Sequence, residues 1–313
     1  MTDRLGRRLK GISLLLLVCT LSCASEESRF KTENVVLVII DGLRYTEGLG
    51  DPKRANTPEM DRLSAVGTII EPFVNGGTAD TQAAVPAVWC GAWTAVHTFA
   101  DPDCGGDENL TSELPTVFEY YRKGLRRPPE DCIYVLQDFG CLWKGSFDED
   151  YGPSYWPTYR PAGSSDTDVW NAAREALDRD RPGFLLVYLS DTDAAGNEGD
   201  WDEYLETIRT ADGIVGQLWD HLQSTRRYAG TTTLLVTNDH GRHTHDPSGH
   251  GCGCAGCQRI QLLAVGPDVK AGHVSRKRRE LIDIAPTIGL LLGFATGKAE
   301  GSAMVEILQA SSR

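Results

Sequence analysis

Five short runs of apolar and β-branched residues constrain the fold of this chain most strongly. They are NVVLVII at 34–40, CIYVL at 132–136, GFLLVYLS at 183–190, TTTLLVT at 231–237 and IQLLAVG at 260–266. Runs that are apolar at nearly every position are typical of strands buried on both faces of a parallel sheet. The first run ends abruptly at Asp41-Gly42, a polar residue and a glycine that indicate the end of a strand.

Helical segments separate these runs. The clearest is TPEMDRLSAVG at 57–67, which opens with Thr57 as N-cap and Pro58 at the first helical position. Further helices are expected at about 114–124, 167–179, 200–224 and 280–293. Strands that alternate with helices predict an α/β fold with a mostly parallel sheet and helices on both faces.

Two long segments interrupt this pattern. Residues 97–113 and 138–166 are rich in glycine, proline, aspartate and aromatic residues. We expect both to be loop insertions that serve as lids or site walls, and surface decoration is the alternative.

Length and charge limit the classes of function. The chain has 313 residues, of which 41% are hydrophobic, and this is enough for the single domain that we place at 34–313. Its formal net charge of −13 argues against a nucleic-acid-binding surface and against binding to anionic membranes. An anionic substrate would therefore need local positive charge, which metal ions supply. The sequence does not predict the oligomeric state.

The N-terminus predicts export. Residues 1–23 combine a basic segment with an apolar run too short to span a bilayer, as in a signal peptide, and 24–33 form a polar tether. Cys23 is the predicted lipidation site, so the membrane is contacted only through a lipid anchor, in the periplasm or at the cell surface. Cleavage after Ala24, giving a secreted protein, and an uncleaved anchor are the alternatives.

Export permits disulfides. By proximity in the sequence, the predicted pairs are Cys90–Cys104 and Cys132–Cys141. In the segment CGCAGC, Cys257 is expected to pair with Cys254 or Cys252, and a structural zinc ion is the alternative there.

Polar side chains that can bind metals follow several of the expected strands. Asp41 follows the first strand, Asp191 and Asp193 follow the third, Asp239 and His240 follow the fourth, and His250 lies in the glycine-rich segment before the fifth. In open α/β sheets, ligands bind at the carboxyl ends of the strands. Carboxylates with imidazoles suit Zn²⁺, or alternatively Mn²⁺. The sequence therefore predicts a metal centre at this edge of the sheet.

The order of these motifs resembles the alkaline phosphatase superfamily, particularly its nucleotide pyrophosphatase/phosphodiesterase, phosphopentomutase and sulfatase-like branches. NVVLVIIDGLR is similar to the first metal-binding strand, NTPEMDRLSAVGT to the helix after it, and TNDHGR to the Asp-His metal motif. LIDIAPTIGLLLGF and GSAMVEIL resemble the closing helix and tail. The resemblance covers most of residues 34–309.

The resemblance implies a nucleophile ten residues before a glycine that ends a helix. With Gly91 as that glycine, Thr81 is the implied nucleophile and also a metal ligand, and Thr78 is the alternative. Sulfatases carry the motif C-x-P-S-R at this point, and the segment TADTQAAVPAVWCG lacks it.

The resemblance also implies two divalent metal ions. Asp41, Thr81, Asp239 and His240 would bind one ion, and Asp193 and His250 would bind the other. Asn197, at the position where the family has histidine, is a less certain ligand, and so is Asp191. His243 and His245 are alternatives from the same loop, although solvent-facing histidines are the simpler interpretation.

The implied activity is hydrolysis of a small phosphate mono- or diester through a phosphothreonine. Two alternatives stay open. One is a phosphoryl transferase or mutase, and the other is a non-catalytic metal-binding surface protein with the same fold.

Overall fold

The computed structural model describes residues 30–100, 108–138 and 145–309. Within these ranges the strands are β1 (Asn34–Ile40), β2 (Thr68–Val74), β3 (Val96–Ala100), β4 (Glu108–Ser112), β5 (Cys132–Leu136), β6 (Gly145–Ser146), β7 (Thr158–Pro161), β8 (Phe184–Leu189), β9 (Thr232–Thr237), β10 (Arg259–Val265), β11 (His273–Ser275) and β12 (Arg279–Glu280). The α-helices are α1 (Pro58–Ser64), α2 (Thr81–Cys90), α3 (Val117–Gly124), α4 (Asp166–Arg179), α5 (Asp191–Glu198), α6 (Trp201–Ser224), α7 (Ala255–Gln258) and α8 (Ile284–Leu292).

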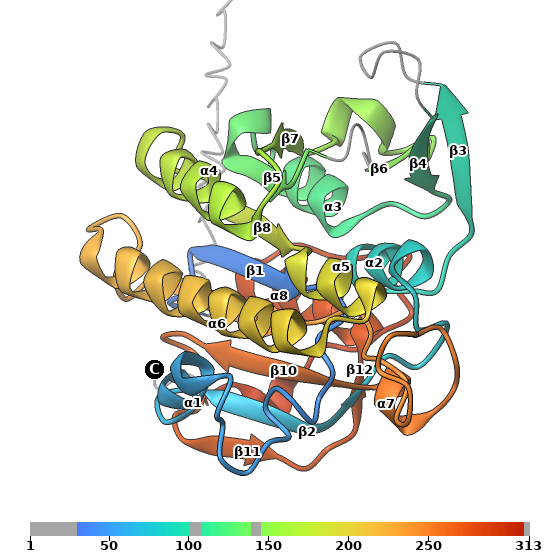
Figure 1. The fold of residues 1–313 in the computed structure, drawn as a ribbon. Coiled ribbons are helices and arrows are strands. Elements are labelled where there is room, and N and C mark those ends of the chain that lie inside the picture. The colour runs from blue at the N-terminus through green and yellow to red at the C-terminus, as the bar shows by residue number, and fades with distance from the viewer. Residues whose placement is uncertain (1–29, 101–107, 139–144, 310–313) are drawn as a thin grey trace, which may run out of the picture.

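Nine of these strands form one sheet, in the order β11-β2-β10-β9-β1-β8-β5-β7, with β12 beside β2. The pairs from β9 to β7 are all parallel, whereas β10 is antiparallel to both β9 and β2. Within the described sheet, β10 therefore runs against the other strands. The predicted fold, α/β with a mostly parallel sheet, is confirmed (Figure 1).

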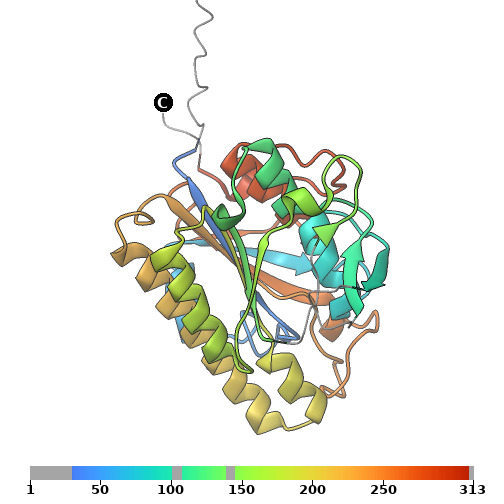
Figure 2. The same cartoon turned by 90° about the horizontal axis from the view of Figure 1, so that it is seen from above.

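Helices cover both faces of the sheet, as Figure 2 shows from above. Because side chains alternate along a strand, β1 supplies both layers. Val36, Val38 and Ile40 pack in the core under α1, α4 and α6. Val35, Leu37 and Ile39 pack in the core under α2, α3 and α8. This double burial explains why the sequence of β1 is apolar at nearly every position.

The two expected loop insertions contain strands, so their prediction as irregular loops is wrong in part. β3 and β4 form a hairpin that, with β6, makes a small three-stranded sheet. β7, inside the expected 138–166 loop, adds the last strand of the main sheet beside β5. The short strands β4, β6 and β7 lack the continuous apolar pattern that identified the buried strands.

The predicted export signal, the predicted tether up to residue 29 and the predicted lipidation site Cys23 lie outside the described residues, as do Cys104 and Cys141. Among the residues that the structure describes, no helix combines the length and apolar character needed to cross a bilayer.

Candidate metal centre

Parallel pairing of β1 with β9 brings the first group of acidic and histidine side chains together. Ile39 lies opposite Thr237 in the register, so Asp41 and Asp239, each two residues further on, leave the sheet at the same level. The Nε2 atom of His240 lies 3.3 Å from an Asp41 oxygen and 3.7 Å from the Asp239 Oδ2 oxygen. All three side chains are buried and offer ligand atoms within 4.8 Å of one another.

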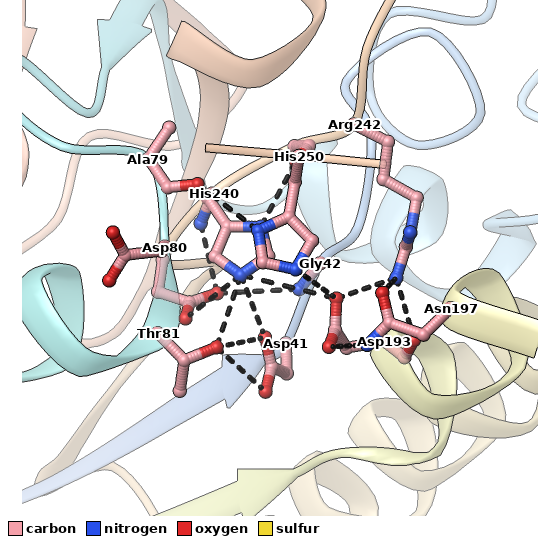
Figure 3. Close-up of polar contacts among 12 residues, drawn as sticks. Asp41, Gly42, Ala79, Asp80, Thr81, Asp193, Asn197, His240, Arg242 and His250 are labelled. Atoms are coloured by element: carbon pink, nitrogen blue, oxygen red, sulfur yellow. Dashed lines mark hydrogen bonds and ion pairs between the residues drawn. The ribbon is translucent and has the colours of Figure 1, made fainter. Parts of the chain in front are cut away.

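Thr81 faces this group from the first turn of α2 (Figure 3). Its Oγ1 atom lies 3.3 Å from an oxygen of Asp41 and 3.1 Å from Nε2 of His240. The helix ends at Gly91, whose φ of 66° is the left-handed conformation that favours glycine. Thr78, the alternative nucleophile, is exposed to solvent. The structure therefore brings Thr81, rather than Thr78, to the acidic group.

Asp193 and His250 form a second group that shares His240 with the first. The Oδ1 atom of Asp193 lies 3.8 Å from Nε2 of His250 and 4.0 Å from Nε2 of His240. The two imidazole rings stack at a centroid distance of 4.1 Å. Gly42 lets α5 approach, because a Cβ atom there would lie 2.4 Å from the Asp193 Oδ1 atom.

Arg242 occupies the side of Asp193 where the sequence placed Asn197 as a ligand (Figure 3). Its buried guanidinium donates at 2.6 Å to the Asp193 carboxylate and at 3.0 Å to the amide oxygen of Asn197. The Asn197 amide in turn donates to Asp193 at 2.7 Å. The amide oxygen that would face a metal thus accepts from a cation instead. Sequence reasoning missed Arg242, although it lies two residues after His240 in TNDHGR.

Asp191 does not join either group, which corrects its assignment as a possible ligand. Its carboxylate accepts hydrogen bonds from Gln137 at 2.6 Å and from the backbone N–H of Asp166 at 2.9 Å, at the start of α4. His245 is exposed, as the simpler interpretation expected. His243 lies beside two cysteines rather than beside Asp193.

Tyr188 is a further residue of the centre that the sequence did not reveal. Its hydroxyl, in β8, donates a 2.5 Å hydrogen bond to Oδ2 of Asp41. That bond fixes the orientation of Asp41, so its Oδ1 atom points toward Thr81 and His240. Tyr188 lies within an apolar strand pattern, where a tyrosine is usually part of the core.

The electrostatics of the first group are those of a site built for a cation. Burial, and then the charge of Asp41, raise the pKa of Asp239 to about 8. Burial opposes the charging of His240, but Asp239, Asp41 and Asp193 together raise its pKa to about 10. Burial and the charge of His240 lower the pKa of His250. Carboxylates clustered in this way favour a bound cation between them.

An unpartnered buried oxygen supports the fit of a divalent metal ion to this first group. The Oδ2 atom of Asp239 is buried without a hydrogen-bond partner among the described residues. A buried carboxylate oxygen without a partner is costly, and a metal ion would satisfy it. Asp41, Thr81 and His240 supply the remaining oxygen and nitrogen donors, a set that suits Zn²⁺ or Mn²⁺. The second group fits less well, because Arg242 already pairs with Asp193.

The cysteines of the described residues are free thiols. Cys90 and Cys132 are fully buried, and their predicted partners Cys104 and Cys141 lie outside the described residues. The Sγ atoms of Cys254 and Cys257 lie 3.6 Å apart, well beyond the length of a disulfide bond of about 2 Å.

Comparisons with known proteins agree with this geometry. A family model described as the metalloenzyme superfamily matches residues 157–296, which include Asp193, His240 and His250. A 2,3-bisphosphoglycerate-independent phosphoglycerate mutase of Desulforudis audaxviator (strain MP104C) is 30% identical over 213 residues, covering 63% of this chain and 39% of the mutase. The chain spans less than half the length of the curated relatives it matches.

Solved structures share the fold at low sequence identity. The phosphonate monoester hydrolase of Agrobacterium radiobacter superposes with a TM-score of 0.66 at 15% identity, covering 90% of this chain and 78% of the hydrolase. Murine ectonucleotide pyrophosphatase/phosphodiesterase 5, in complex with AMP, gives a TM-score of 0.64 at 13% identity, covering 88% of this chain and all of that one.

These relatives belong to a superfamily of metal-dependent hydrolases and mutases that act on phosphoryl and sulfuryl groups. The predicted resemblance to the alkaline phosphatase superfamily is therefore confirmed.

Proposed function

We propose that this protein is a metal-dependent hydrolase of phosphate esters in which Thr81 is the nucleophile. The observation that carries the proposal is the position of the Thr81 hydroxyl, 3.3 Å from Asp41 and 3.1 Å from His240 at the N-terminus of α2. A threonine hydroxyl is a weak nucleophile unless its pKa is lowered. Divalent metal ions, when bound, would lower that pKa and neutralise the charge of the substrate.

The residues of the chain provide the rest of the reaction. The N-terminal end of α2 presents backbone N–H groups and a positive dipole end, which favour a phosphate group beside Thr81. The Thr81 oxygen attacks phosphorus in line, the bond from phosphorus to the ester oxygen breaks, and the alcohol leaves with a proton. Water then attacks the phosphothreonine from the opposite side, which releases phosphate and restores the hydroxyl.

Asp193, His250 and Arg242 form the other half of the centre. The guanidinium of Arg242 is fully buried and places its positive charge next to Asp193. We infer a first metal site of Asp41, Thr81, Asp239 and His240, and a weaker second site of Asp193 and His250. Zn²⁺ is the expected ion, with Mn²⁺ as the alternative.

Phosphoryl transfer to a second hydroxyl is the competing function, and the match to a phosphoglycerate mutase over 213 residues favours it. Both reactions share the attack by Thr81 and differ in the acceptor for the phosphoryl group. Hydrolysis is preferred because the match covers only 39% of the mutase, so the match does not imply an acceptor site in this chain.

Activity against a panel of esters tests the proposal. The panel holds p-nitrophenyl phosphate, bis-p-nitrophenyl phosphate, p-nitrophenyl sulfate and p-nitrophenyl ester of AMP, each with Zn²⁺ or Mn²⁺ added to metal-free protein. We expect a phosphate ester to be hydrolysed, and kcat to fall on the order of 10³-fold or more in Thr81→Ala. Thr78→Ala is the matched control and should retain activity. Turnover of the sulfate alone, or a Thr81→Ala variant that stays active, would contradict the proposal.

We also propose that the chain is exported and anchored through lipidated Cys23. Support comes from the basic and apolar segments before it and from the polar tether after it. Intact-mass measurement of protein extracted from membranes should give a chain that begins at a lipidated Cys23. A soluble chain that begins at Ser25 would contradict the anchor but not the export.

A further inference from the structure

A second cluster of metal-binding side chains lies in the loop between β9 and β10, outside the carboxylate centre. The ligand atoms of His243, Cys252 and Cys257 lie within 4.8 Å of one another. The Sγ atom of Cys257 is 3.6 Å from that of Cys252 and 3.6 Å from that of Cys254. Cys257 is fully buried in the short helix α7, and the other three residues are half-buried around it.

The sulfur distances favour a metal ion over a disulfide. A disulfide needs its sulfur atoms about 2 Å apart. Two thiolates on one tetrahedral zinc ion, each about 2.3 Å from it, lie about 3.8 Å apart. Both measured distances from Cys257, 3.6 Å, are close to that edge length. A disulfide of Cys257 would also leave one of its two neighbours unpaired, whereas a metal ion uses all three thiols.

Backbone hydrogen bonds hold the cluster in this arrangement. The N–H of Cys254 donates to Sγ of Cys252 at 3.3 Å, a contact that stabilises a thiolate. The N–H of Gly241 donates to the carbonyl of Cys257 at 2.9 Å, and the N–H of His243 donates to the carbonyl of Gly249 at 2.8 Å. These bonds connect the start of the loop, at Gly241 and His243, to its later part, at Gly249 and Cys257.

The imidazole of His243 links the cluster to the carboxylate centre. Its Nε2 atom lies 2.9 Å from the backbone carbonyl of His250. A carbonyl only accepts, so Nε2 carries the proton and Nδ1 keeps the lone pair that binds metals. Histidine ligands of metals are commonly oriented by such a second hydrogen bond.

We propose that His243, Cys252, Cys254 and Cys257 bind a structural zinc ion. His243, Cys252 and Cys257 supply three donors within 4.8 Å of one another, and Cys254, whose Sγ atom lies 3.6 Å from that of Cys257, supplies the fourth. Three thiolates and one imidazole are a complete tetrahedral donor set for Zn²⁺, and the spacing C-x-C-x₂-C places the three cysteines on a short turn. The ion closes the loop that carries His250 and so fixes that residue against the catalytic group. This site neither needs nor supplies the metals of the proposed phosphoesterase.

Cobalt substitution of the full chain tests the site without relying on activity. We expect Co²⁺ added to reduced, metal-free protein to give the near-ultraviolet thiolate charge-transfer band and the intense visible bands of tetrahedral sulfur coordination. Zinc-edge X-ray absorption of the zinc-loaded protein should show sulfur neighbours at about 2.3 Å. Spectra with oxygen and nitrogen neighbours alone would overturn the proposal.

Matched variants separate this site from the carboxylate centre. Cys252→Ser and His243→Ala should each weaken or remove the thiolate band. Asp41→Asn, which removes a carboxylate ligand, and Cys90→Ser, a buried thiol elsewhere, should keep it. Cys257→Ser could fail to fold because Cys257 is buried. In that case the Cys252→Ser variant, at a half-buried position, still tests the site through its thiolate band. Two results together would show a disulfide and overturn the proposal. Protein purified without reductant would have a mass lower by two hydrogens, and the reduced protein would bind no zinc at these residues.

Discussion

At the scale of single residues, Asp193 distinguishes the two halves of the candidate metal centre. Asp41 and Asp239 meet histidine and threonine, whereas Asp193 accepts from Arg242 at 2.6 Å and from Asn197 at 2.7 Å. A guanidinium beside a carboxylate reduces the attraction of that carboxylate for a second cation. Metal affinity should therefore differ between the two groups by more than the ligand types alone suggest.

Replacement of Asn197 by histidine tests this asymmetry. Calorimetric titration of metal-free protein with Zn²⁺ should show two separable steps, and Asn197→His should tighten the weaker step because imidazole nitrogen binds Zn²⁺ better than an amide oxygen does. Asn197→Ala is the control, since it removes the contact with Arg242 without adding a ligand. Equal affinities in both variants would mean that residue 197 does not reach the metal.

At the scale of elements, α2 couples helix capping to the position of the proposed nucleophile, Thr81. The carboxylate of Asp80 accepts from the N–H of Ala83 at 3.0 Å and so fixes the first turn that carries Thr81. The helix has no charged residue of its own in that turn. Its capping residue therefore determines both the stability of the helix start and the direction of the Thr81 hydroxyl.

Asp80→Ala should lower the free energy of unfolding by about 1 kcal/mol. Urea denaturation measures the loss, and steady-state kinetics should show a fall in kcat with smaller change in KM. Ser165→Ala removes the equivalent cap of α4, where the Ser165 hydroxyl accepts from the N–H of Asp168 at 3.2 Å. That control should lose similar stability but no activity. Loss of activity in both variants would indicate a general effect of destabilisation.

At the scale of the whole molecule, the sequence predicted the strands whose burial produces a regular apolar pattern along the chain. The five predicted strands, β1, β5, β8, β9 and β10, are confirmed, because burial on both faces makes nearly every position apolar. β2 was missed because Glu71 and Pro72 interrupt its apolar pattern. The predicted helix at 280–293 is a 3-10 turn over Leu281–Asp283 followed by α8.

In the candidate site, too, the sequence predicted the features that depend on local pattern and strand order. Asp41, Asp239 and His240 could be predicted to meet because parallel strands end at one edge. The contacts of Arg242 and Tyr188 could not be predicted, because they depend on the direction in which each side chain points from its loop or strand. The cluster of His243 with the cysteines depends on the closure of the whole loop, which sequence spacing alone does not give.

A buried carboxylate couples the stability of the whole molecule to pH. Burial, and then the charge of Asp191, raise the pKa of Asp166 from 3.8 to about 7 in the folded protein. Its Oδ2 atom is buried without a hydrogen-bond partner among the described residues. Because the folded state binds the proton more tightly, its stabilising contribution is complete below pH 3.8 and is lost as the pH rises through about 7.

The difference in unfolding free energy between the native chain and Asp166→Asn isolates this contribution. Urea denaturation at several pH values should show the native chain losing stability relative to the variant as the pH rises from about 4 to about 8. A difference that is constant with pH would mean that Asp166 does not titrate in this range.

The central claim is covalent catalysis by Thr81, and trapping the intermediate tests it most directly. Metal-loaded protein is mixed with the phosphate ester that it hydrolyses fastest, quenched in acid and digested, and the peptide containing residue 81 is sequenced by mass spectrometry. We predict a phosphate group on Thr81 that is absent without metal. Turnover without any phosphopeptide, or phosphate on Thr78 instead, would contradict the assignment, and no hydrolysis of any ester by metal-loaded protein would contradict the enzyme itself.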